Sequence, residues 1–147
     1  MTAAAICLLA GAAPPKAPPK EPAHVEIVVA PEAARPGGEA HVTVRLSPAE
    51  GIKINRYPKI KLKVAGEDGV VAGSEAAVGN AEPPPPEHIE TNYFKTVDPV
   101  ELTLRVDSKA TAGQHKVAGQ LSYFYCVAAS GFCAPAKVAV TIPLLIR

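Results

Sequence analysis

From about Ala23 to the end of the chain, apolar and polar residues alternate one by one in several short segments. Such alternation is typical of β-strands with one buried face and one solvated face. The segments cover residues 25–29, 42–46, 52–54, 60–64, 100–106, 117–123 and 138–142, with Gly- and Pro-containing turns between them. No stretch shows a 3.6-residue apolar period. We therefore predict an all-β fold, an immunoglobulin-like antiparallel β-sandwich of about seven to nine strands.

The sequence consists of two short N-terminal segments and one large domain. Its 147 residues suffice for one domain with a buried core, which we place at residues 23–147. Residues 13–22 are rich in Pro and Lys and predict a stiff polyproline-type linker. Residues 1–12 are apolar, too short to span a bilayer, and end in a small-residue cleavage pattern, which indicates a signal peptide. We therefore expect a periplasmic or secreted protein.

Two proline-containing segments interrupt the strand pattern. Residues 82–87 contain four consecutive prolines and are expected to be an extended loop, because proline cannot donate to a sheet ladder. Pro143 predicts that the last strand ends at an edge or a bulge.

Charge and histidine spacing exclude several classes of site. The net charge is +1 with both signs scattered, so we expect no nucleic-acid partner and no stable membrane insertion after signal cleavage. The histidines stand singly, without the spacing of metal ligands, and we expect neither a metal site nor a cofactor. They are His24, His41, His88 and His115.

The cysteines carry the most specific chemical signal. Cys7 would leave with the signal peptide, so that Cys126 and Cys133 remain and are expected to form a disulfide in an oxidising compartment. They lie between two strand signals, which predicts the tip of a β-hairpin with turn chemistry from Gly131 and Pro135. Strand parity places Cys126 on the face opposite the main core. No Lys, Arg or helix N-terminus is evident beside either cysteine to stabilise a thiolate.

This pair has two possible roles. A structural staple would close a short loop and stabilise the fold by about 2–3 kcal/mol. A reactive disulfide is favoured by the aromatic residues, most of which gather near the cysteines, although a local core under the hairpin tip is an alternative. The gathered aromatics are Tyr93, Phe94, Tyr123, Phe124, Tyr125 and Phe132, and only Tyr57 lies elsewhere.

Three segments, within a region from about Val25 to Leu144, resemble the N-terminal periplasmic domain of the thiol:disulfide interchange protein DsbD family. They are Gly51–Asn55, His88–Lys95, and Tyr123–Cys133 continuing to a strand that ends in Pro143-Leu144. The Gly-Phe-Cys sequence ending at Cys133 is the most specific part of this resemblance.

The resemblance implies an immunoglobulin-like sandwich with a redox-active pair, in which Cys133 forms mixed disulfides and Cys126 resolves them. It also implies that residues 88–95 form a cap loop over the disulfide. Its shielding residues would be Glu90, Asn92, Tyr93 and Phe94, and Phe124, Tyr125 and Phe132 would flank the partner surface. The implied partner is a thioredoxin-like protein or domain that donates or accepts electrons.

This sequence also departs from that family. Six residues separate the cysteines where the family has five, and Ile52, Lys53 and Asn55 replace the tyrosines that follow the family's glycine. The cap aromatic aligns only after a shift of one or two residues. The chain has no membrane domain and no thioredoxin-like domain, so the electron donor would be a separate protein. The expected function is thiol:disulfide exchange of the protein-disulfide reductase type; the alternative is a non-catalytic binding or accessory sandwich with a structural disulfide.

Overall fold

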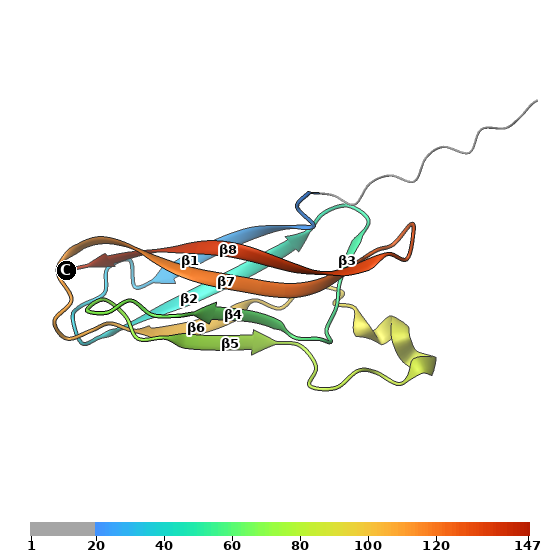
Figure 1. Cartoon of the computed structure of the whole chain (residues 1–147), viewed down its shortest axis with the longest axis horizontal. Coiled ribbons are helices and arrows are strands. Elements are labelled where there is room, and N and C mark those ends of the chain that lie inside the picture. Colours follow the sequence, from blue (N-terminus) through green and yellow to red (C-terminus); the bar gives the residue numbers. More distant parts are fainter. Residues whose placement is uncertain (1–19) are drawn as a thin grey trace, which may run out of the picture.

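The computed structural model describes residues 20–147, which form two antiparallel sheets packed face to face (Figure 1). The smaller sheet has the order β1-β2-β6. In the larger sheet β8, β7, β4 and β5 lie side by side in this order, and the short β3 pairs with the end of β7 on the same side as β4. The strands are β1 (Ala23–Ala30), β2 (Glu39–Pro48), β3 (Ile52–Ile54), β4 (Ile60–Val64), β5 (Ser74–Val78), β6 (Val100–Arg105), β7 (Gly113–Val127) and β8 (Cys133–Ile146), and η1 (Pro86–Asn92) is a short 3-10 helix. The predicted all-β immunoglobulin-like sandwich is confirmed.

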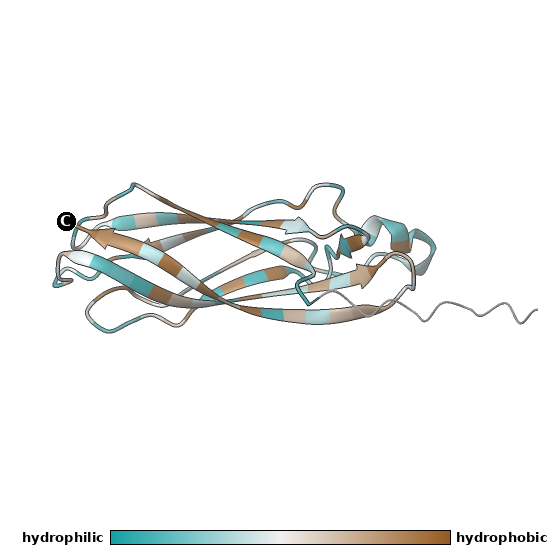
Figure 2. Cartoon of the chain, turned by 90° about the horizontal axis from the view of Figure 1, so that it is seen from above, coloured by the Kyte–Doolittle hydropathy of each residue, from teal (hydrophilic) through white to brown (hydrophobic). Residues whose placement is uncertain are grey.

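Alternating burial explains why these segments form strands. In β2, β4 and β6 every second side chain is buried, and the intervening ones face solvent. Figure 2 shows this alternation as successive brown and teal bands along the strands. Fully buried side chains from both sheets meet in one core, which includes Val42, Val44, Ile60, Leu62, Leu104, Leu121, Tyr123 and Ile142. Burial of this apolar surface is the main stabilising contribution to the fold.

Strand β7 is the longest element and organises the larger sheet. Along one side it pairs with β8, residue by residue, from Gly113 to Cys126. Along its other side it pairs with β4 in the middle and with β3 only at its last three residues. The hairpin tip therefore has three strands side by side, β3, β7 and β8, at the end of the sandwich where η1 also lies (Figure 1).

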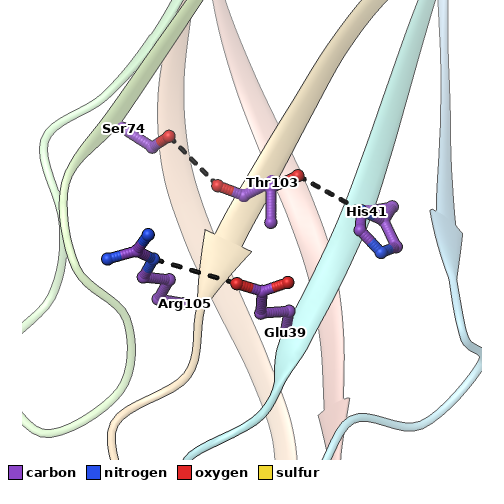
Figure 3. Close-up of polar contacts among 5 residues, drawn as sticks. All are labelled: Glu39, His41, Ser74, Thr103 and Arg105. Carbon is purple, nitrogen blue, oxygen red and sulfur yellow. Dashed lines mark hydrogen bonds and ion pairs between the residues drawn. The ribbon is translucent and has the colours of Figure 1, made fainter.

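Strand β5 closes the gap between the edges of the two sheets. The Ala72 amide donates to the Arg105 carbonyl (3.0 Å), and Ser74 Oγ donates to the Thr103 carbonyl (3.1 Å). Across β2 and β6, His41 Nδ1 lies 3.2 Å from Thr103 Oγ1, and Glu39 pairs with Arg105 at 3.8 Å (Figure 3). The Ala72 and Ser74 contacts occupy backbone carbonyls at the edge of β6 that would otherwise be unpaired, whereas the other two contacts join side chains of paired strands.

Two local predictions about prolines need correction, and a third is confirmed in part. Pro86 and Glu87 begin η1 instead of continuing the extended loop, because a proline at the start of a helix needs no N–H. Pro135 lies inside β8, opposite Phe124, and not in the turn. As Pro143 predicts, β8 is an edge strand, where a proline withholds no hydrogen bond from a neighbour, but the strand does not end there and continues to Ile146.

The predictions for the N-terminus are only partly covered. The signal peptide at residues 1–12 and most of the linker at residues 13–22 lie outside the described residues. The end of that linker contacts the domain, because Pro22 is buried and its carbonyl accepts a hydrogen bond from Ala49 (2.9 Å). Between residues 20 and 147, no helix is long and apolar enough to cross a membrane.

Candidate functional site

Cys126 and Cys133 form a disulfide at the end of the β7–β8 hairpin. They are the last pair of the β7–β8 register, so the bond joins directly opposite residues of neighbouring strands. The five residues between β7 and β8 make the turn. In it, Gly131 has φ of 71° and donates from its amide to the Val127 carbonyl (2.9 Å). The predicted hairpin and disulfide are confirmed.

The two sulfurs of this disulfide have very different surroundings. Cys126 is 4% exposed, whereas Cys133 is an exposed residue beside the turn. As strand parity predicted, Cys126 does not join the main core, although its neighbour Tyr125 does. Its burial therefore comes from other segments that cover the outer face of the sheet. A thiolate approaching from solvent meets Cys133 before it meets Cys126.

Tyr93 and Asn55 are the groups that contact the buried sulfur. Tyr93 Oη donates to Cys126 Sγ at 3.6 Å, and Asn55 Oδ1 lies 3.5 Å from the same sulfur. A disulfide sulfur has no proton, so the Asn55 contact is a packing contact in the oxidised state. After reduction, the Cys126 thiol could donate to this oxygen, and a reoriented amide could donate to the thiolate.

Backbone hydrogen bonds hold Tyr93 in place. Tyr93 and Asn55 form an isolated antiparallel bridge, and the amide of Phe94 donates to the Ile54 carbonyl (3.0 Å). Asn55 in turn donates from its amide to the Phe124 carbonyl of β7 (2.9 Å). Tyr93 is thus attached to the sheet beside the hairpin tip, which explains how a residue 33 positions away reaches Cys126.

Asn92 anchors the same segment with its side chain. Its Oδ1 accepts a hydrogen bond from the Tyr57 amide, and its Nδ2 donates to the Tyr57 carbonyl, both at 2.9 Å. Asn92 is itself buried, so losing these bonds would leave unpaired polar groups inside the protein. Its contacts are with Tyr57 and not with the sulfurs, so it positions Tyr93.

The remaining expected cap residues have other contacts. Phe94 is buried in the main core, with the Arg56 guanidinium 4.9 Å from its ring centroid, so it is an anchor and not a lid. Glu90 is exposed on η1 and lies 3.8 Å from His88. Most of η1 is exposed to solvent. The covering contact on the disulfide is therefore made by Tyr93.

The three expected flanking aromatics occupy three different environments. Tyr125 is buried in the core, Phe124 is half-buried opposite Pro135, and Phe132 is exposed in the turn. Only Phe132 offers a free apolar surface next to Cys133. Tyr125 supports the hairpin from inside.

Lys53 corrects the expectation that no cation lies near the cysteines. It stands directly opposite Cys126 in the β3–β7 register, so both side chains project from the same face of the sheet. Its Nζ lies 5.0 Å from the centroid of the Tyr93 ring. Lys53 is 73 residues from Cys126 along the chain, and only the pairing of β3 with the tip of β7 brings them together.

The histidines form no metal site in the part of the chain that the structure describes, where no cluster of three or more His, Cys, Asp or Glu side chains could hold an ion. His41 contacts Thr103, and His115 contacts the Thr111 carbonyl (2.8 Å).

No protein-family model, no curated protein and no solved structure matches this chain. A functional interpretation therefore depends on the geometry of the site itself.

Proposed function

We propose that this protein is a thiol:disulfide exchange module that relays electrons through the Cys126–Cys133 pair in the periplasm or another exported compartment. The observation that supports it is the asymmetry of the disulfide: Cys133 is exposed at a hairpin tip, and Cys126 is buried under Tyr93. Exchange rates depend on which sulfur is accessible and on how well the other sulfur leaves. The proposed partner is a thioredoxin-like protein with two thiols.

In the first step, the donor thiolate attacks Cys133 Sγ. The Cys126–Cys133 bond breaks, and Cys126 leaves as a thiolate that carries the bonding electron pair. The second thiol of the donor then attacks the donor sulfur of the mixed disulfide, which releases Cys133 as a thiolate. The donor is oxidised to a disulfide, and the Cys126–Cys133 pair is reduced by two electrons.

Electron transfer onward reverses these roles. Cys133 attacks the disulfide of an acceptor and forms a new mixed disulfide, and Cys126 resolves it by attacking Cys133. The acceptor leaves as a dithiol, and the Cys126–Cys133 disulfide is restored.

The groups around Cys126 suit its role as the leaving thiolate. A buried thiolate is unfavourable unless donors or a cation stabilise it. Tyr93 Oη already points at Cys126 Sγ, and the Asn55 amide can turn an N–H toward it. Lys53 contributes positive charge on the same face, above the Tyr93 ring.

The alternative is a binding or accessory sandwich with a structural disulfide. The regular β7–β8 ladder favours it, because the disulfide simply extends an existing register. A cross-link closing so short a loop would stabilise the fold by about 2.5 kcal/mol. That function needs neither an exposed Cys133 nor polar groups directed at Cys126.

Exchange with reduced thioredoxin tests the proposed function. The protein used is the full chain carrying Cys7→Ser, in which Cys126 and Cys133 are the remaining cysteines. To make each remaining cysteine a target, single variants at Cys126 and Cys133 are first converted to mixed disulfides with a small chromogenic thiol. We expect Cys126→Ser, which retains Cys133, to exchange with thioredoxin at least tenfold faster than Cys133→Ser. Equal rates in the two variants would contradict the proposed attack at Cys133.

A further inference from the structure

A basic groove adjoins the disulfide on the side of the cap. Lys53, Arg56 and Lys95 contribute its positive charges, and Glu90 is the only carboxylate in its lining. The groove is open to solvent and has a volume of about 590 Å³, within the range of small-molecule sites. Tyr93 forms part of its wall and also touches Cys126 Sγ, so groove and disulfide share a side chain.

The positive charges of this basic groove have no carboxylate partners within residues 20–147. The ion pairs in that part of the chain are Glu26–Arg45, His88–Glu90 and Glu39–Arg105. Glu90 is thus directed toward His88, while Lys53 and Arg56 lie over aromatic rings. With three cations and one carboxylate in its lining, the groove carries a net positive charge that attracts anionic groups.

Exposed apolar side chains accompany the groove at this end of the molecule. Ile89 of η1 is 55% exposed and Phe132 of the hairpin turn is 47% exposed. Both segments lie at the cysteine-bearing end of the sandwich (Figure 1). Single exposed apolar residues are common on proteins, so the positive charge of the groove is the feature that points to a ligand.

We infer that the basic groove binds carboxylate side chains next to the reactive cysteine of a protein redox partner. This inference rests on the proposed function and adds the chemistry of the partner: an acidic surface around its thiol. A protein can place several carboxylates around its thiol, which matches a groove lined by three cations better than a small acidic thiol does. Complementary charge would raise the rate of encounter more than the final affinity.

The test uses two synthetic peptides with one cysteine each, flanked by Asp and Glu in one peptide and by Asn and Gln in the other. The measured quantity is the second-order rate constant for mixed-disulfide formation with the oxidised full chain carrying Cys7→Ser. Taking the ratio of acidic to neutral peptide on each variant cancels differences in thiol reactivity. Salt is varied from about 0.01 M to about 1 M, where the Debye length falls from about 30 Å to about 3 Å.

Two variants with equal loss of charge separate the groove from overall charge. One carries Lys53→Gln, Arg56→Gln and Lys95→Gln, and the control carries changes of three exposed lysines outside the groove, Lys63→Gln, Lys109→Gln and Lys116→Gln. We expect the groove variant to lower the acidic-to-neutral ratio about tenfold at low salt. The control should change the ratio less than about twofold, and about 1 M salt should remove the preference in every protein.

The remaining outcomes contradict the groove, the protein partner or the proposed function, one by one. Equal ratios in the wild type and the groove variant, or an equal loss in the control, would overturn the inference while exchange itself stands. The rate constants for glutathione and for its ethyl ester are compared in the same way. If the groove variant lowers the ratio of glutathione to its ester but leaves the peptide ratio unchanged, the assignment to a protein partner is overturned. Failure of every thiol to react would contradict the proposed function. If the triple variant does not fold, Lys95→Glu at an exposed position should lower the ratio severalfold.

Discussion

Two polar clusters of this protein use similar side chains in opposite ways. On β2, β5 and β6, Glu39 pairs with Arg105, His41 contacts Thr103, and Ser74 binds a backbone carbonyl (Figure 3). Beside the hairpin tip, Lys53 and Arg56 instead lie over aromatic rings without a carboxylate partner. The first cluster satisfies its own charges and hydrogen bonds across neighbouring strands.

The cluster on β2, β5 and β6 contributes to the stability of the fold, whereas the cluster beside the hairpin tip has groups that can take part in a reaction. The paired cluster also lines a hollow, of about 480 Å³, but its opposite charges largely offset each other and contribute only a little to stability. At the hairpin tip, the unpaired cations, the Tyr93 hydroxyl and the Asn55 amide surround a buried sulfur and an open groove. Substitutions in the two clusters should therefore affect different properties, and the following predictions run from the largest expected effect to the smallest.

Replacing Asn92 should release the cap. Asn92→Ala removes both hydrogen bonds to Tyr57, and the associated loss of about 1–3 kcal/mol would raise the open population of the Tyr93 segment roughly tenfold or more. The measurement is the alkylation rate of Cys126 in the full chain carrying Cys7→Ser and Cys133→Ser. Thr91→Ala is the control, because Thr91 bonds only to the His88 carbonyl (2.7 Å). An unchanged alkylation rate in Asn92→Ala would show that Asn92 does not hold the cap closed.

Removing the Tyr93 hydroxyl should slow exchange without destabilising the fold. Tyr93→Phe keeps the ring over the disulfide but loses the donor directed at Cys126 Sγ. Because hydrogen bonds to charged groups are among the stronger ones, we expect attack on Cys133 to slow about tenfold. Tyr123→Phe, which changes a buried tyrosine of the core, should leave this rate unchanged. Equal rates for wild type and Tyr93→Phe would mean that the hydroxyl does not stabilise the leaving thiolate.

Tyr123 should make stability depend on alkaline pH. Burial raises the pKa of its phenol above the ordinary value of 10.0, with a further contribution from Tyr125. Above pH 10 the unfolded state loses this proton while the folded state retains it, so the free energy of unfolding falls until pH passes the folded-state pKa. We expect Tyr123→Phe to reduce this fall between pH 9 and 11, measured by urea unfolding of the oxidised protein. Parallel pH profiles of the two proteins would contradict the prediction.

Neutralising the paired cluster should have the smallest effect. The variant with Glu39→Gln and Arg105→Gln removes an exposed ion pair, which is worth less than about 1 kcal/mol. Its exchange rate with reduced thioredoxin should equal that of the wild type. A change in rate of more than about twofold would show that this cluster and the hairpin tip are coupled.

The sequence pattern predicts much of the sandwich because burial alternates in most strands. Strand β5 escapes prediction, since Ser74–Val78 has two adjacent alanines and no clear apolar alternation. The hairpin disulfide follows from two cysteines between strand signals. Pro135 was misleading, because an edge strand accommodates proline where a central strand does not, whereas Pro143 correctly indicated an edge strand but not its end.

The environment of Cys126 depends on contacts that sequence spacing does not reveal. Lys53 reaches it only through the pairing of β3 with the end of β7, Asn55 through its backbone hydrogen bond to Phe124 of β7, and Tyr93 through its bridge with Asn55. Tyr93 and Phe94 are adjacent aromatics, but one covers the disulfide and the other enters the core. The sequence shows only an Asn between the proline-rich segment and the Tyr93-Phe94 pair, and the burial that makes Asn92 an anchor is seen only in the structure.

The reduction potential of the Cys126–Cys133 pair tests the proposed exchange most directly. The full chain carrying Cys7→Ser would be equilibrated with glutathione buffers of defined composition, and its oxidised fraction would be measured after acid quenching. The account predicts a potential of about −200 mV, at which the pair can exchange electrons with partners of an oxidising compartment. A potential well below about −300 mV would identify a structural disulfide and contradict the relay.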